Sequence, residues 1–308
     1  MQVGDVLGGF KLPAPAPEPK PVKRERGMFE AEVARQDITY THPILMQCYF
    51  PVRHNARNDQ FWQMENGHAS MVVRAGILAV RDKPHTFETC SVPAGPKCRL
   101  VTAFINNFIM KHRSRDVPLG DSMRDGMKKL GVRIGGQNRA ALEREIKNFA
   151  AAEIVMGTWG DRGSVRQDQT KISSRITLWS DRDEQSSMMR VSAEYYEMIL
   201  DGGMAPGYWP ALVDLQDSAR AMDILSFMIH RLRGTIRHPV RLSPEILHGL
   251  FGSDIALLKN FWPRFRPALA AAHKWYPNAR IELLPNHGGL LLRNSEPLIP
   301  YRKTPRLS

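Results

Sequence analysis

Two stretches of the chain repeat one order of expected elements: a helix, a short strand, a short helix, a glycine turn, a long helix and a hairpin. In the second stretch, VRLSPEILHGLFGSD predicts the strand, the short helix and the turn, with Ser243 as N-cap and Pro244 at the first helical position. Two short helices broken by a glycine fill a core poorly, but they present the next helix to an outside partner. We therefore expect an α+β protein with two tandem winged helix-turn-helix domains.

The first copy begins with a helix in KCRLVTAFINNFIMKHR. DVPLGDSMRDGMKKLGV then predicts a short strand, a short helix capped by Asp121 or Ser122, and a stop at Gly131. GGQNRAALEREIKNF predicts the long helix, with Leu142 and Ile146 on its inner face. The first wing is expected as a hairpin of EIVMGTW and TKISSRITLW, joined by the polar GDRGSVRQDQ.

The second copy begins with the helix SARAMDILSFMIHRLRG. Its long helix is expected in IALLKNFWPRFRPALAAAHKWYP, with Leu258, Phe261 and Phe265 facing the core. Pro263 and Pro267 lie within this pattern, so we expect a kink or two separate segments. ARIELLPNHGGLLLRNS predicts the second wing.

Composition divides the chain into four parts. Residues 1–38 are expected to be a mobile, Pro-rich arm with the basic run KPVKRER. Residues 39–182 and 191–300 are the two expected domains, and 301–308 are a tail. The polar SDRDEQSSMMR, residues 180–190, is the predicted domain junction.

The net charge of +12 favours nucleic acid or an anionic membrane surface as a partner. Residues 41–190 hold 23 Lys and Arg against 15 Asp and Glu, so the excess belongs to folded parts and not to a basic tail. The sequence has no 18-residue apolar run and no secretory signal pattern, and its three cysteines follow no metal spacing. We expect a cytoplasmic protein with no membrane partner.

The motifs of several enzyme classes are missing. The sequence has no GxxxxGK[ST] phosphate loop, no HExxH and no paired CxxC. We therefore expect no catalytic residues, no metal site, no cofactor and no enzymatic activity. A nucleic-acid-processing enzyme is the weaker alternative.

Candidate DNA contacts are the polar side chains left on the open faces of the expected helices and wings. Arg, Asn and Gln on the long helices are the residue types that read base edges, and Lys and Arg on the wings would contact phosphates. On the long helices they are Gln137, Asn138, Arg139, Arg144, Lys147, Asn148, Lys259, Asn260, Arg264 and Arg266. On the wings they are Arg162, Arg166, Lys171, Arg175, Arg280 and Arg293.

Four segments resemble, in order, the C-terminal region of plasmid RepA-type replication initiators. They are DLQDSARAMDILSFMIHRL, SPEILHGLFGSD, NFWPRFRPALAAAHKWYPNARIE and GGLLLRNS. LGDSMRDGMKKLGV and GGQNRAALEREIKNF are similar to the segment that precedes them in that family. The resemblance covers about residues 95–300, and the two prolines in the last long helix depart from it.

This resemblance implies sequence-specific binding to double-stranded origin DNA, usually at repeated sites, and recruitment of the host replication initiator and helicase proteins. The protein would then be associated with the nucleoid or the plasmid. A transcriptional repressor on the same scaffold is the alternative, because DNA binding alone does not separate the two. A homodimer is also possible, through a strand edge in MQCYFPV or ASMVVRAGILAV, although these segments suit a buried sheet equally well.

Overall fold

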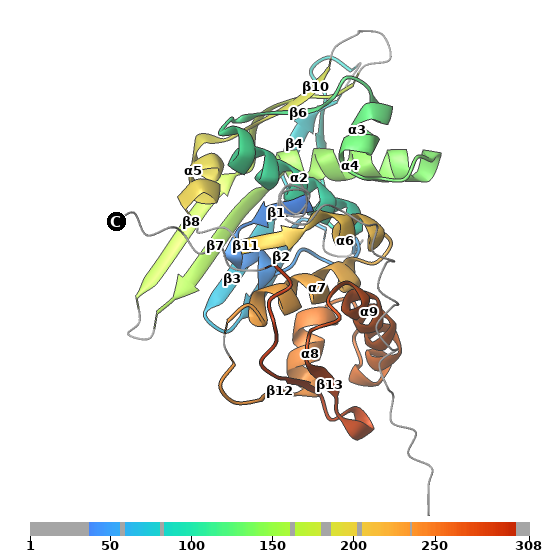
Figure 1. Cartoon of the computed structure of the whole chain (residues 1–308). Coiled ribbons are helices and arrows are strands. Elements are labelled where there is room, and N and C mark those ends of the chain that lie inside the picture. The colour runs from blue at the N-terminus through green and yellow to red at the C-terminus, as the bar shows by residue number, and fades with distance from the viewer. Residues whose placement is uncertain are drawn as a thin grey trace, which may run out of the picture.

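The computed structural model describes residues 37–55, 59–80, 83–160, 164–179, 186–201, 205–234 and 236–299. Helices alternate with small antiparallel sheets, so the predicted α+β class is confirmed (Figure 1). Most of the predicted arm, residues 1–36, lies outside the described residues, and so do the predicted tail and Arg162.

The first half of the chain contains a helix, strand, helix, helix unit that ends in a hairpin. Ser122 caps its short helix by accepting a hydrogen bond from the Asp125 N–H at 3.1 Å. Gly131, with a φ of 65°, turns the chain toward the long helix. The elements are α2 (Gly95–His112), β6 (Asp116–Gly120), α3 (Met123–Lys129), α4 (Gly136–Ala151), β9 (Ser173–Thr177) and β10 (Ser187–Val191). The strands form one sheet in the order β6-β10-β9.

The same connectivity recurs in the second half. Ser243 caps the short helix through the Ile246 N–H, and Pro244 occupies its first turn, as predicted. The elements are α7 (Ala219–Arg231), β12 (Val240–Leu242), α8 (Pro244–Phe251), α9 (Trp262–Trp275), β13 (Ile281–Leu283) and β14 (Leu290–Leu292). Their sheet has the order β12-β14-β13, so in both units the first strand lies beside the last.

The long helix of the second unit is divided as its prolines predict. A 3-10 turn, η2 (Leu258–Asn260), precedes α9, and the chain changes direction at Phe261. Pro263 lies in the first turn of α9, where its missing N–H has no helical partner to lose. Pro267 lies inside the helix, which continues to Trp275.

The predicted first wing is wrong in its pairing. The polar loop does join a hairpin, but its strands are β7 (Glu153–Trp159) and β8 (Val165–Lys171). These extend β2 (Phe61–Asn66) and β3 (Ala69–Arg74) into a separate four-stranded sheet, β2-β3-β7-β8. The hairpin of the first unit is β9–β10 instead. Period-two alternation identifies strands but does not say which strands pair.

The predicted domain junction is also wrong for the part that the structure describes. β10 starts inside residues 180–190 and pairs with both β6 and β9, so it completes the first sheet beyond the predicted boundary at 182. α5 (Ala193–Asp201) follows and packs near α2 and β8. The chain then enters β11 (Ala205–Tyr208), which pairs with β1 (Ile38–Thr41), and α6 (Trp209–Asp214) leads into the second unit.

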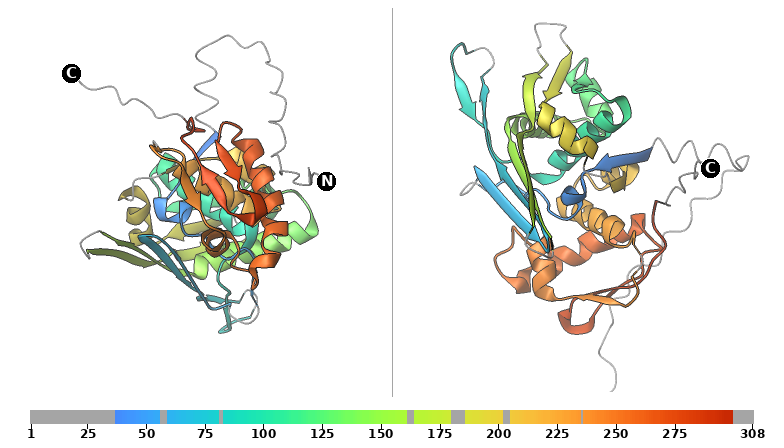
Figure 2. Two further views of the ribbon diagram at one scale, coloured as in Figure 1. Left: turned by 90° about the horizontal axis from the view of Figure 1, so that it is seen from below. Right: turned by 90° about the vertical axis from the view of Figure 1, so that its left-hand side faces the viewer.

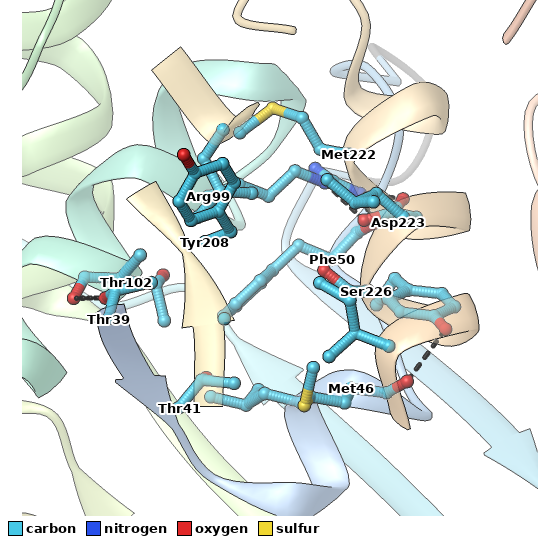
Figure 3. A pocket seen from close by; sticks show the side chains of 17 residues that line it. Thr39, Thr41, Met46, Phe50, Arg99, Thr102, Tyr208, Met222, Asp223 and Ser226 are labelled. Carbon is cyan, nitrogen blue, oxygen red and sulfur yellow. Dashed lines mark hydrogen bonds and ion pairs between the residues drawn. The ribbon is translucent and has the colours of Figure 1, made fainter. Parts of the chain in front are cut away.

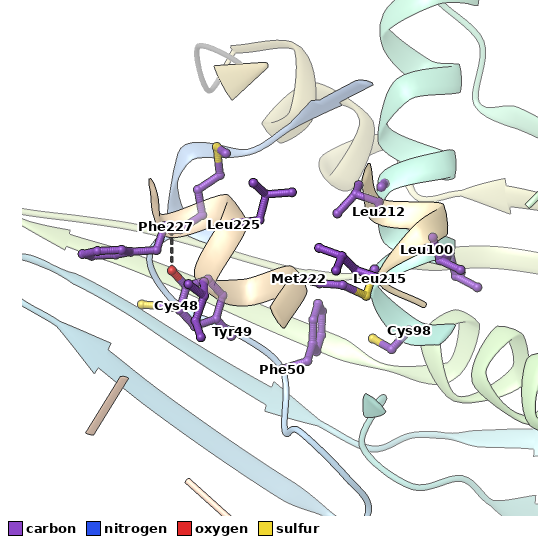
Figure 4. Packing of buried hydrophobic residues seen from close by; sticks show 14 of the residues in the cluster. Cys48, Tyr49, Phe50, Cys98, Leu100, Leu212, Leu215, Met222, Leu225 and Phe227 are labelled. Atoms are coloured by element: carbon purple, nitrogen blue, oxygen red, sulfur yellow. Dashed lines mark hydrogen bonds between the residues drawn. The ribbon is translucent and has the colours of Figure 1, made fainter. Parts of the chain in front are cut away.

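One hydrophobic core joins the two units (Figure 4). Tyr49 and Phe50 follow the 3-10 turn η1 (Pro43–Met46) and are both 4% exposed. The Tyr49 ring stacks on Phe251 of α8 with centroids 5.8 Å apart, and the Phe50 ring meets Phe149 of α4 edge-on at 6.3 Å. Neighbouring residues therefore insert into different units and hold them together.

A buried ion pair crosses the same junction (Figure 3). Nε and Nη2 of Arg99 on α2 contact the two carboxylate oxygens of Asp223 on α7 at 2.7 and 2.6 Å. The remaining guanidinium N–H groups donate to the backbone carbonyls of Phe50, Pro51 and Gly95. Because every donor of this arginine has an acceptor, α2 and α7 are fixed in one relative position.

Candidate nucleic-acid interface

The N-terminal end of α9 presents a basic and amide-bearing surface. Lys259 and Asn260 are exposed in η2, directly before the helix, and the Arg264 side chain is 53% exposed in its first turn. The other side of this turn is anchored, because the fully buried rings of Phe261 and Phe265 stack with centroids 4.8 Å apart. The exposed side chains therefore project from a fixed backbone.

The tip of the second hairpin lies against this end of α9. The ring of His287, in the 3-10 turn η3 (Pro285–His287), lies 5.0 Å from the ring of Trp262. Nη2 of Arg266 lies 3.2 Å from Nδ1 of His287, and Arg241 on β12 donates to the Gly288 carbonyl at 2.9 Å. Arg266 thus links the helix to the hairpin tip.

Asp254, in the turn between α8 and α9, gathers three arginines. Its buried partner is Arg220 of α7, which also donates to the Phe251 carbonyl at 2.6 Å. Arg53 approaches from the N-terminal region, with Nε 3.5 Å from the Asp254 carboxylate and Nη2 3.2 Å from its carbonyl. Nη1 of Arg264 lies 3.7 Å from the same carboxylate. One negative charge cannot balance three positive charges, so the surface stays basic.

The N-terminal half of α4 presents a comparable surface in the first unit. Gln137 and Arg139 are exposed, and the Arg144 side chain is 58% exposed. Asn138 is partly buried and donates to the Arg133 carbonyl at 3.0 Å, while Nε of Arg144 is held by Glu145 at 3.2 Å. The predicted helix and its outward arginine are therefore placed together as the sequence suggests.

The C-terminal half of α4 is covered, which makes the prediction for Asn148 wrong. Asn148 is 3% exposed and accepts a hydrogen bond from the Ser91 N–H at 3.1 Å. Nζ of Lys147 lies 3.8 Å from Glu88 and 3.5 Å from Glu143, so this cation is partly neutralised. Helical periodicity could not predict this burial, because the residues that cover the C-terminal half of α4 are residues 87–94, from an earlier part of the chain.

The candidate residues of the first hairpin do not form one cluster: Lys171 and Arg175 line a common groove, and Arg166 does not line it. Arg166 and Lys171 lie on β8 in the four-stranded sheet, whereas Arg175 lies on β9 in another sheet. Arg166 is 65% exposed and pairs with Asp168 of its own strand at 3.2 Å. With Arg162 outside the described residues, no cluster of these four arises from the part of the chain that the structure describes.

Arg280 and Arg293 lie at the open end of the second hairpin. The Arg293 N–H donates to the Arg280 carbonyl at 2.9 Å, and Nη2 of Arg293 lies 3.4 Å from Glu282. Arg280 follows the C-terminal end of α9, a helix of 14 residues that spans about 21 Å. These two arginines are therefore remote from Lys259, Asn260 and Arg264.

Residues 51–55 connect the two exposed helix ends. Arg53 and His54 line a cleft of about 580 Å³ that continues to the turn 253–256. They also line a second cleft that includes Asn138 and Arg144 of α4. His54 is fixed there by Glu145, whose buried carboxylate lies 2.6 Å from Nε2 and also accepts from the Ala94 N–H. α4 and α9 both lie on the right-hand side of Figure 1.

Sequence reasoning missed Arg53, Arg241 and Asp254. Arg53 lies in a loop without helical or strand periodicity, and Arg241 lies on a three-residue strand. Asp254 carries the wrong charge for a DNA contact and matters here only through the arginines that it positions. Only its place in the glycine turn before the long helix, in FGSD, singled it out in the sequence.

Other site chemistry is sparse within the described ranges. They contain no group of three or more His, Cys, Asp or Glu side chains placed to hold a metal ion. Burial lowers the pKa of Lys97, which borders the α4 cleft and donates to Gln216 at 3.1 Å. Among the same residues, no helix combines the length and the apolar character needed to cross a membrane.

No protein-family model and no curated protein matches the sequence. Among solved structures, the chain is similar to crystal structures of domains 2 and 3 of RctB. One has 10% sequence identity and a TM-score of 0.48, covering 82% of this chain and 99% of that chain. The other, RctB residues 155–483, has 12% identity and a TM-score of 0.48, covering 81% and 94%.

Proposed function

We propose that this protein is a plasmid replication initiator that binds origin DNA sequence-specifically through two winged helix-turn-helix units. The observation that carries the proposal is the recurrence of one connectivity around two long helices, each with an open, basic N-terminal end. HTH proteins place the N-terminal residues of such a helix against base edges in the major groove. The net charge of +12 supplies the sequence-independent attraction to phosphates.

In the second unit, α9 is the reading helix. Asn260 and Arg264 are the residue types that pair with adenine and guanine, and Lys259 is free to contact a phosphate. The hairpin tip, braced by Arg266 and Arg241, lies beside the helix and would follow the adjacent backbone. In the first unit, Gln137, Arg139 and Arg144 form the reading surface of α4.

The two units read one stretch of DNA together. Their common core and the Arg99–Asp223 pair leave little freedom for relative motion, so the two contacted segments must have a fixed spacing. Arg53 lies between the helices and contacts the backbone that joins the two segments. Repeated copies of such a site would make the origin, where bound copies recruit the host replication initiator and helicase. The protein acts in the cytoplasm on plasmid DNA, and it forms no membrane contact and needs no cofactor.

A replicon test separates this proposal from a transcriptional repressor on the same scaffold. The gene and its adjacent repeat DNA are placed on a plasmid that lacks its own origin, and transformants are counted. We expect maintenance with the natural chain, loss with Lys259→Ala/Arg264→Ala, and retention with Arg74→Ala, which removes an exposed arginine of the four-stranded sheet. Site-specific footprints without any replication would favour the repressor. Absence of specific binding throughout the plasmid would refute both.

A further inference from the structure

A groove of about 640 Å³ lies between two hairpins at the C-terminal end of α4. One wall is β4 (Ile77–Ala79), which pairs with β5 (Phe87–Thr89), and the other is β9. The right-hand view of Figure 2 shows the two hairpins standing next to each other. The floor is the last turn of α4, on which the β4 hairpin is seated: a Cβ at Gly76 would lie 2.0 Å from the Ala151 carbonyl oxygen.

The walls of this groove offer unpaired strand edges and apolar side chains. β4 pairs only with β5, and β9 is the outer strand of its sheet, so among the described strands neither has a partner on the side of the groove. The apolar lining includes Ile77, which is 63% exposed, together with Leu78, Ile176 and Leu178. Exposed edges next to apolar side chains are the features by which proteins bind extended peptides as an added strand.

The charge of the groove is positive. Lys171 and Arg175 line it, are exposed, and form no ion pair with a described residue. Glu88 also lines the groove, but Lys147 partly neutralises it at 3.8 Å. An occupant with carboxylates beside Lys171 and Arg175 would balance charges that the chain itself leaves unbalanced.

We propose that this groove binds an extended, acidic and apolar segment of a partner protein. The sugar-phosphate backbone of DNA would satisfy the two cations but not Ile77 and its apolar neighbours. The groove also lies at Lys147, ten residues or about 15 Å along α4 from the exposed Gln137. The protein can therefore hold DNA and this partner at once. The inference does not depend on the proposed function, since the groove uses neither of the N-terminal helix ends to which DNA binding is assigned.

The test uses the full chain and a defined probe. A fluorescein-labelled octapeptide of alternating Asp and Leu is titrated by fluorescence anisotropy, alongside a peptide with Lys in place of every Asp. We expect the acidic peptide to bind saturably with a Kd below about 1 mM, because a short peptide outside its protein loses conformational freedom on binding and binds weakly. The basic peptide should not saturate. Hydrogen exchange should slow at the amides of β4 and β9 when the acidic peptide is bound.

Two variants locate the binding. Lys171→Glu/Arg175→Glu should lower the affinity for the acidic peptide by about tenfold and raise the affinity for the basic one. Both side chains are exposed, so the substitutions reverse the charge of the groove without disturbing the core. Lys274→Glu, at an exposed lysine in the last turn of α9 that belongs to neither surface, is the control and should leave peptide binding unchanged. Failure of the acidic peptide to saturate would overturn the proposal, and so would binding that ignores the double variant. Displacement of the peptide by a short DNA duplex would assign the groove to DNA and also overturn it.

Discussion

The two units share one connectivity but differ in how far apart in sequence their parts lie. In the C-terminal unit, α9 runs almost directly into β13 and β14, and the hairpin tip returns to the start of the helix through His287 and Trp262. In the N-terminal unit, β7 and β8 intervene between α4 and β9, and they join a different sheet. Residues 87–94 then cover the C-terminal half of α4.

Under the proposed function, this difference gives the two units unequal roles. The reading end of α9 keeps its exposed basic residues and a hairpin braced beside it, which suits base recognition. The N-terminal half of α4 lines the cleft that contains Arg53, and its C-terminal end forms the floor of the groove between β4 and β9. In this proposal the N-terminal unit therefore has two binding surfaces, whereas the C-terminal unit has only the DNA-reading one.

The largest expected effect comes from breaking the connection between the two units. Asp223→Ala leaves the Arg99 guanidinium buried without its carboxylate and should lower the free energy of unfolding by about 3–5 kcal/mol. Urea denaturation measures this loss. Arg99→Met/Asp223→Leu removes both charges, and it should be less damaging than the single change. A loss below about 1 kcal/mol for Asp223→Ala would mean that the pair does not hold the units together.

A pH effect should follow from His42, which lies between β1 and the 3-10 turn η1. His42 is 7% exposed, and its Nδ1 accepts the Ile44 N–H at 3.2 Å. Burial lowers its pKa from 6.5 to about 4, with Asp168 opposing and Arg166 adding to the shift. Between these values the unfolded chain binds more protons than the folded protein, so stability is full above pH 6.5 and decreases as the pH falls toward 4.

The lowering of the His42 pKa corresponds to a loss of free energy of unfolding of up to about 3 kcal/mol. Urea midpoints between pH 4 and 7 measure it. His42→Asn keeps a capping acceptor but does not titrate, so its stability should fall less steeply than that of the natural chain. Parallel curves for the two proteins would exclude His42 as the source.

The same contrast explains what the sequence could predict. Caps and stops such as Ser122, Gly131 and Ser243 act on adjacent residues, and the predicted helices and the second hairpin were correct. Pairing of β9 with β10 and burial of Asn148 depend on segments distant in the chain, which periodicity does not report. The exposure of Arg144 and Arg264 could be predicted because an open helix face is a local property. The Asp254 cluster joins residues 201 positions apart, which no local pattern reports.

Base reading by the two helices is the next effect in size. Arg264→Ala and Arg144→Ala should each cost about 1–3 kcal/mol on the specific site and little on random DNA. Competition binding with both DNAs measures the two losses. Asn148→Ala serves as the control, since its side chain is buried, and should leave discrimination unchanged. Equal losses on specific and random DNA would reduce the arginine concerned to a phosphate contact.

The smallest expected effect concerns the salt dependence of binding. Arg53 lies between the two reading helices with its side chain 64% exposed, so it is placed to contact a phosphate. Arg53→Ala should therefore flatten the slope of log K against log salt by about 0.9, the change for one contact. Arg166 is equally exposed, but it lies in the four-stranded sheet beside Asp168. Arg166→Ala should leave the slope unchanged, and binding isotherms from about 50 to 200 mM salt compare the two. A flattened slope for Arg166→Ala alone would move the DNA path from the cleft between the helices to the four-stranded sheet.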